Sequence, residues 1–314
     1  MGSTVAVIGA GLIGRAWAIV FARAGVPVRL FDVDQSTLKA AREAMATSLH
    51  DLEAAGLISA SGEILDRVTL SSDLHDALQG ADYVQECGPE NTDIKRSIYS
   101  ELERHAYGNA ILASSTSGIV ASEFTGHLER PWRCLVAHPV NPPYLVPLVE
   151  VVPGPQTAPE VVERTMALMR QIGQKPIHVR REIEGFVLNR LQGALLTEAL
   201  RLFQDGYVSA EDIDKTVKDG LGLRWSFMGA LETIDLNAPG GVVDYARRYG
   251  PLYTTVDMQR TGPAPWNDEV LAALETELRR QRPAAELPAR QEWRDRRLMA
   301  LVAHKQAATD ELGS

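Results

Sequence analysis

An imidazole and a carboxylate lie twelve residues apart in the stretch "HPVNPPYLVPLVEVVP", which covers residues 138–153. His138 stands at the end of one apolar run and Glu150 lies inside the next. A buried carboxylate without a partner is costly, so Glu150 needs a hydrogen-bonding group nearby. An imidazole suits proton transfer near neutral pH, and a carboxylate on its second ring nitrogen fixes the tautomer. These residue types point to general base chemistry, although a single histidine before a proline is more often structural.

A glycine-rich turn near the start of the chain offers a second kind of chemistry. The segment "TVAVIGAGLIGRAWAIVFARAG" begins with a β-branched apolar run, turns on Gly9, Gly11 and Gly14, and continues with helical spacing. Gly9 permits the turn, Gly11 lets a pyrophosphate approach the backbone, and Gly14 lets helix and strand pack closely. The N–H groups at the start of this helix, at Leu12 and Ile13, are therefore expected to bind phosphates.

The next strand, "VPVRLFDVD", carries Asp32 near its end, eighteen residues after Gly14. A carboxylate at this position accepts hydrogen bonds from the ribose hydroxyls of a dinucleotide. It would repel a 2′-phosphate, and no arginine directly follows it, so the sequence favours NAD over NADP.

The elements that must position these residues alternate along the first half of the chain. Strands are expected at "RVTL", "ADYVQEC", "AILASST", "CLVAHP", "LVEVVP" and "KPIHVRR", with helices around 36–55, 91–105 and 158–172. This alternation predicts a Rossmann-type doubly wound α/β sheet over residues 1–184, with its ligand beyond the carboxyl ends of the strands. Polar clusters at 86–90, 114–118 and 138–141 would face one crevice there. Residues 185–314 lose the strand pattern and predict an all-helical C-terminal domain for substrate binding and dimerisation.

The composition restricts the possible partners. The 314 residues are 45% hydrophobic, enough for two cores, and the net charge of −9 argues against binding nucleic acid or an anionic membrane surface. No apolar run approaches the roughly 20 residues that span a bilayer. Cys87 and Cys134 lie in apolar runs, which favours buried free thiols in a reducing, cytoplasmic setting.

Six motifs in order resemble the 3-hydroxyacyl-CoA dehydrogenase superfamily almost from end to end. They are Gly9-x-Gly11-x-x-Gly14, the E-x-x-x-x-K of Glu90 to Lys95, "STS" at 115–117, "HPVNP" at 138–142, "LVEVV" at 148–152 and "GFVLNR" at 185–190. The sequences of residues 138–153 and of "GLGLRWSFMGALETIDLNAPGG" at 220–241 are similar to those of the branch of lambda-crystallin and L-gulonate 3-dehydrogenase.

The resemblance implies NAD-dependent oxidation of a CH–OH group. It gives His138 the role of base and Glu150 that of its partner, while Ser117 and Asn189 would hydrogen-bond the reacting oxygen and hold it against the nicotinamide. Ser117 could instead close a turn or cap a helix, and Asn189 could bond backbone at the domain junction.

Further positions follow from the same motifs. Asn141 would order this network beside the cofactor, and Glu90 and Lys95 would lie near the nicotinamide ribose together with Ser117. The alternative for Glu90 and Lys95 is a surface couple five residues apart.

The substrate stays open between several small molecules. A free hydroxy acid needs one close cation for its carboxylate, and Arg224 is the candidate, unless it only packs on Trp225. Ala230 and Leu231 replace the Pro and Phe that the family often has, so the pocket wall differs. The resemblance favours L-gulonate as the substrate, and the alternative substrates are L-carnitine and a short-chain L-3-hydroxyacyl-CoA. A further alternative is that the chain is a non-enzymatic, crystallin-like NAD-binding protein. Helical second domains of this superfamily usually dimerise, so a homodimer is expected.

Overall fold

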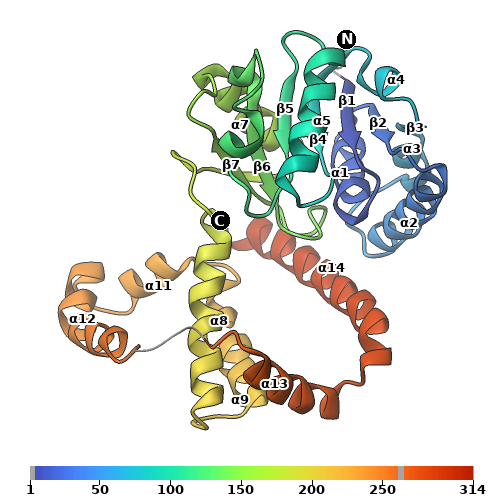
Figure 1. Cartoon of the computed structure of the whole chain (residues 1–314). Helices are drawn as coiled ribbons and strands as arrows, with labels where there is room; N and C mark the ends of the chain where they lie inside the picture. Colours follow the sequence, from blue (N-terminus) through green and yellow to red (C-terminus); the bar gives the residue numbers. More distant parts are fainter. Residues whose placement is uncertain (1–3, 261–264, 314) are drawn as a thin grey trace. The chain divides into compact units, whose positions relative to one another are not determined.

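A computed structural model describes residues 4–260 and 265–313 and divides the chain into two compact units (Figure 1). The first unit runs to Arg190 and also includes the chain from Arg294 onward. The second unit is Leu191–Trp293.

An eight-stranded sheet forms the centre of the first unit, in the order β3-β2-β1-β4-β5-β6-β7-β8. The strands are β1 (Thr4–Ile8), β2 (Val28–Phe31), β3 (Val68–Ser71), β4 (Ala81–Glu86), β5 (Ile111–Ser114), β6 (Cys134–Pro139), β7 (Leu148–Pro153) and β8 (Lys175–His178). Neighbours are parallel except β6 and β7, which pair antiparallel because the short connection between them holds no crossover helix. The predicted Rossmann-type sheet is confirmed, with its last two strands reversed.

Helices cover both faces of this sheet. They are α1 (Leu12–Arg23), α2 (Gln35–Ala54), α3 (Ser61–Asp66), α4 (Leu74–Leu78), α5 (Thr92–His105), α6 (Ala121–Thr125) and α7 (Pro159–Gln171). Successive residues of β1 enter different cores: Val5 and Val7 pack with α1 and α2, whereas Ala6 and Ile8 pack with α5 and α6. A parallel sheet buried on both faces needs such continuous apolar strands, and this places every strand end at a defined edge.

The second unit is helical, as the sequence predicts. It holds most of α8 (Leu188–Gln204), α9 (Ala210–Lys215), the π-helical turn η2 (Thr216–Leu221), α10 (Gly222–Trp225), α11 (Ala230–Leu236), α12 (Gly241–Met258), α13 (Asp268–Gln281) and the start of α14 (Leu287–Leu312). None of the helices in the described ranges is both long and apolar enough to cross a membrane.

The two compact units differ from the expected domains of 1–184 and 185–314, which remain a prediction. Residues from Arg294 onward belong to the first unit, and the first boundary falls after Arg190. The physical reason is burial: Met299 on α14 is only 4% exposed within the core cluster that contains α1 and α2, and Leu298 packs against the same cluster. The apolar residues of this last helix therefore complete the sheet domain.

Candidate active site

The glycine turn between β1 and α1 leaves open backbone at the start of the helix. Gly9 has φ +101°, and a Cβ there would lie 2.8 Å from the carbonyl oxygen of Cys87. A Cβ on Gly14 would lie 1.8 Å from the carbonyl oxygen of Gly9, so neither position tolerates a side chain. At Gly11 nothing lies within 4 Å of an added Cβ. The turn is therefore tightly packed at Gly9 and Gly14 and open at Gly11.

This open backbone fits a dinucleotide pyrophosphate. Gly11 is the N-cap of α1 and provides no side-chain acceptor, so the first N–H groups of the helix, including those of Leu12 and Ile13, are left for a ligand. Asp32, at the end of β2, accepts a hydrogen bond from the Ala10 N–H at 2.8 Å. That bond holds the carboxylate beside the glycine turn, where the sequence predicts a ribose contact.

His138 and Glu150 face each other across the antiparallel pair β6–β7. They are register partners, and His138 Nδ1 lies 2.9 Å from Glu150 Oε2. Both residues are buried, at 5% and 0% exposure. An ionised carboxylate only accepts, so Nδ1 carries the proton and Nε2 is left as the basic nitrogen. The arrangement orients one imidazole for proton transfer.

The other oxygen of Glu150 holds the beginning of α8. Oε1 accepts from the N–H groups of Val187 at 2.8 Å and Leu188 at 2.9 Å. Burial alone would raise the pKa of Glu150, but the hydrogen bonds from His138, Leu188 and Val187 outweigh it and hold the pKa below its usual value. Glu150 is therefore ionised near neutral pH. One of its oxygens orients the imidazole, and the other accepts from the N–H groups at the start of α8.

A strained turn at Phe186 positions the N–H groups of Val187 and Leu188. Phe186 has φ +48°, in the left-handed region that non-glycine residues rarely occupy. Its ring is fully buried and lies 5.5 Å from the ring of His138, centroid to centroid. Burial of the ring and the bonds to Glu150 hold the turn in place.

Ser117 and Asn189 are brought together at the end of β5. Asn189 Nδ2 donates to the backbone carbonyl of Ser117 at 2.6 Å. Across the described residues, the Ser117 hydroxyl itself makes no hydrogen bond, and the side chain of Ser117 is exposed. The backbone contact expected as an alternative for Asn189 is thus present, while the Ser117 hydroxyl is free to bind a ligand.

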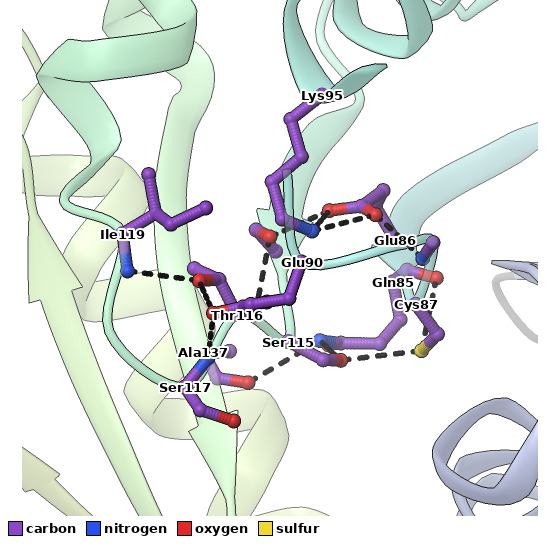
Figure 2. A network of polar contacts seen from close by, with 12 residues as sticks. Gln85, Glu86, Cys87, Glu90, Lys95, Ser115, Thr116, Ser117, Ile119 and Ala137 are labelled. Atoms are coloured by element: carbon purple, nitrogen blue, oxygen red, sulfur yellow. Dashed lines mark hydrogen bonds and ion pairs between the residues drawn. The ribbon is translucent and has the colours of Figure 1, made fainter. Parts of the chain in front are cut away.

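Glu90 and Lys95, in contrast, take separate partners (Figure 2). Lys95 on α5 is 1% exposed, and its Nζ pairs with both oxygens of Glu86 at 2.9 and 3.0 Å. Glu90 bonds the loop after β5. The alternative of a surface couple between Glu90 and Lys95 is wrong, and a cofactor contact by Lys95 would require it to leave a buried ion pair.

Two residues inside the predicted polar clusters at 86–90 and 114–118 were given no individual role by sequence reasoning. Glu86 is completely buried at the end of β4 and also accepts from Ser114 Oγ at 2.5 Å. Thr116 is 1% exposed and bonds Glu90. A carboxylate ending the apolar strand "ADYVQE" is the signal for Glu86, since it demands a partner as Glu150 does. Thr116 lies inside the "STS" motif at 115–117, but nothing in the sequence indicates that its hydroxyl has a role of its own.

The remaining predicted site residues have no partner that fixes their role. Asn141 is exposed beyond β6, and no hydrogen bond within residues 4–260 and 265–313 involves its side chain. Arg224 lies on α10 of the second unit and is half-buried; among the described side chains it forms no ion pair and no cation–π contact. Burial raises the pKa of the Cys87 and Cys134 thiols to about 12, so neither is a nucleophile at neutral pH.

The chain matches known proteins along most of its length. Residues 4–183 match the NAD binding domain of 3-hydroxyacyl-CoA dehydrogenase, and residues 185–284 match its C-terminal domain. The chain is 44% identical to the lambda-crystallin homolog of Bos taurus over 96% of this chain and 95% of that one. It is 39% identical to L-carnitine dehydrogenase of a Pseudomonas species over 79% and 77% of the two chains. Among solved structures, 5-formyl-3-hydroxy-2-methylpyridine 4-carboxylic acid 5-dehydrogenase, an NAD⁺-dependent dismutase, aligns with a TM-score of 0.82 and 29% identity over 98% of each chain.

Proposed function

Because the chain belongs to the 3-hydroxyacyl-CoA dehydrogenase family, and is thus an NAD-dependent oxidoreductase of CH–OH groups, we propose that it oxidises the 3-hydroxyl of a small free hydroxy acid, in the manner of L-gulonate 3-dehydrogenase. The observation that carries the proposal is the buried contact of 2.9 Å between His138 and Glu150, which lies at the strand edge where the glycine turn opens.

In the proposed mechanism His138 Nε2 accepts the proton of the substrate hydroxyl. The imidazolium that forms is stabilised by the charge of Glu150, which keeps Nδ1 as the donor. The Ser117 hydroxyl and the Asn189 amide hold the reacting oxygen in line with the base. Bound NAD supplies the acceptor for the hydride that leaves the same carbon.

The function is tested by recording NADH formation over a panel of substrates. The panel contains L-gulonate, L-carnitine, other 3-hydroxy acids and 3-hydroxybutyryl-CoA. The fastest turnover is expected with a free hydroxy acid. L-carnitine is the second candidate, because a relative at 39% identity is an L-carnitine dehydrogenase. Faster turnover with 3-hydroxybutyryl-CoA would assign the chain to acyl-CoA oxidation, and NAD binding without any turnover would favour the crystallin-like role.

Arg224 is proposed to bind the substrate carboxylate, supported by its half-buried position and by the absence of an ion-pair partner within the described ranges. Arg224→Leu should lower kcat/KM for the free acid by roughly one to two decades, the range for a hydrogen bond to a charged group. Arg224→Lys should lower kcat/KM less than Arg224→Leu does, since lysine keeps the positive charge but lacks the planar guanidinium group.

The measurement compares the acid with its methyl ester in wild type and variant. The ester should be affected far less, because it presents no anion. Arg247→Leu, at an exposed position of α12, serves as the control. Equal losses on acid and ester would assign Arg224 a structural role.

Cofactor choice is proposed to depend on Asp32. Asp32→Ala should weaken NADH binding by about 10- to 100-fold, because a charge-assisted hydrogen bond to a ribose hydroxyl is lost, and should narrow the preference over NADPH. Fluorescence titration of both cofactors measures this preference. Asp34→Ala is the matched control, since Asp34 caps α2 through Ser36. Wild-type protein that binds NADPH as tightly as NADH would contradict the assignment.

A homodimer is proposed through the helical unit. Large apolar residues between Gly222 and Met258 are exposed, including Phe227 at 71%, Leu231 at 78% and Leu252 at 56%. Sedimentation velocity tests the dimer. A cytoplasmic location is also proposed, consistent with two free cysteines, and is tested by cell fractionation.

A further inference from the structure

One oxygen of Glu90 receives three hydrogen bonds from the loop that carries Ser117. Oε1 accepts from Thr116 Oγ1 at 2.6 Å, from the Ser117 N–H at 2.8 Å and from the Gly118 N–H at 3.2 Å. Glu90 lies between β4 and α5, whereas these donors follow β5, so the bonds tie two neighbouring strand ends together (Figure 2). Hydrogen bonds to an ionised acceptor are roughly twice as strong as neutral ones.

The Thr116 hydroxyl extends this anchor into the rest of the loop. While donating to Glu90, Thr116 Oγ1 accepts from the Ile119 N–H at 3.0 Å and from the Gly118 N–H at 3.4 Å. Thr116 is 1% exposed, so its hydroxyl has little access to water. Residues 116–119 are therefore folded around one hydroxyl, and Glu90 fixes that hydroxyl (Figure 2).

Ser117 is held on its other side by Asn189, which donates to the Ser117 carbonyl at 2.6 Å. Both backbone polar groups of Ser117 thus have partners, whereas its hydroxyl has none within the described chain. A fixed main chain with a free hydroxyl is the arrangement expected when the direction of that hydroxyl matters. Because Glu90 is exposed, its bonds contribute more to local order than to global stability.

We propose that Glu90 is a positioning residue that sets the direction of the Ser117 hydroxyl by holding the backbone of residues 116–118. The inference deepens the proposed function and rests on it for the role of Ser117. It differs from the contact with the nicotinamide ribose expected from the sequence, because Glu90 acts here through another residue. The two roles make different predictions about how substitutions combine.

A double-mutant cycle separates the two roles. Glu90→Ala should lower kcat/KM by roughly 10- to 100-fold, mainly through kcat, with NAD affinity nearly unchanged. Glu90→Gln, which keeps an acceptor oxygen, should retain most of the activity, and Thr116→Val should fall between the two. In a Ser117→Ala background, Glu90→Ala should cost less than about threefold more, because its target is already lost. If Glu90→Ala lowers kcat/KM by the same factor in both backgrounds and also weakens NAD binding, the proposal is overturned in favour of a ribose contact.

Amide hydrogen exchange gives a readout that needs no substrate. Glu90→Ala should accelerate exchange at Ser117 and Gly118, measured by mass spectrometry on a peptide covering 113–120. Glu103→Ala is a matched control, since Glu103 holds the N–H groups of Glu129 at 3.0 Å and Arg130 at 2.8 Å in another loop. It should accelerate exchange there and leave 115–118 unchanged.

The two hypotheses can therefore fail separately. Wild-type protein that oxidises no hydroxy acid would defeat the proposed function, and the exchange measurement would still decide about Glu90. Unchanged exchange at Ser117 and Gly118 in Glu90→Ala would overturn the positioning role whatever the substrate is.

Discussion

His138→Ala is expected to lower turnover by at least about 100-fold and to leave NAD affinity nearly unchanged, since a positioned general base contributes on this scale. The imidazole is the buried group that Glu150 orients, and its Nε2 is the nitrogen left to accept a proton. Glu150→Gln should also be impaired, because the neutral amide stabilises an imidazolium less and accepts more weakly from the N–H groups that begin α8.

Steady-state kinetics and NADH titration of the same preparations check this result. His127→Ala is the control, because His127 is on the surface and bonds only Ser100 Oγ, at 2.9 Å, among the contacts of the described chain. A His138→Ala variant that kept most of its turnover would remove His138 from the mechanism, and equal losses in both histidine variants would point to a general defect.

Lys95→Met is expected to lower the free energy of unfolding by about 3 to 5 kcal/mol, the usual range for breaking a fully buried ion pair. The substitution leaves the Glu86 carboxylate, at 0% exposure, without its cation. Gly88 N–H and Ser114 Oγ still donate to it, at 2.6 and 2.5 Å, but they cannot neutralise its charge. Adding Glu86→Gln should recover part of the loss, because no uncompensated charge then remains.

Chemical denaturation of the variants measures this effect. Arg104→Ala provides a control in the same helix, since Arg104 pairs with Glu101 at 2.9 Å while both side chains are exposed, at 64% and 43%. Surface pairs of this kind contribute about 0 to 1 kcal/mol. A loss in Lys95→Met no larger than in Arg104→Ala would show that the buried pair does not stabilise the fold.

The sheet and the strand-end clusters could be predicted from sequence because their signals are local. The glycines at 9, 11 and 14 restrict the backbone within one turn, and apolar runs with polar ends define the strands. The pairing of His138 with Glu150 was implied by the resemblance to the family and by the need of a buried carboxylate for a partner. The antiparallel register that places the two side chains opposite each other comes from the structure.

Contacts between residues on different strands and helices have no comparable local signal in the sequence. Lys95 has carboxylates at 86 and 90 within reach along the chain, and only the packing of α5 against β4 decides that Glu86 is its partner. Glu90 bonds Thr116 across 26 residues, which depends on how two strand ends come together in space. Met299 falls in the range 185–314 that predicts a helical domain, yet it packs with the core of the first unit, because a helix pattern does not reveal which core its apolar residues fill.

The discontinuity of the first unit affects the order in which the chain can fold during synthesis. Residues 4–190 leave the ribosome first, but the apolar core they form includes Met299, which emerges more than a hundred residues later. Domains generally fold as units while the chain grows. The nascent sheet domain must therefore hold an unfilled apolar site while the whole helical unit is made, and its packing is completed only when α14 arrives.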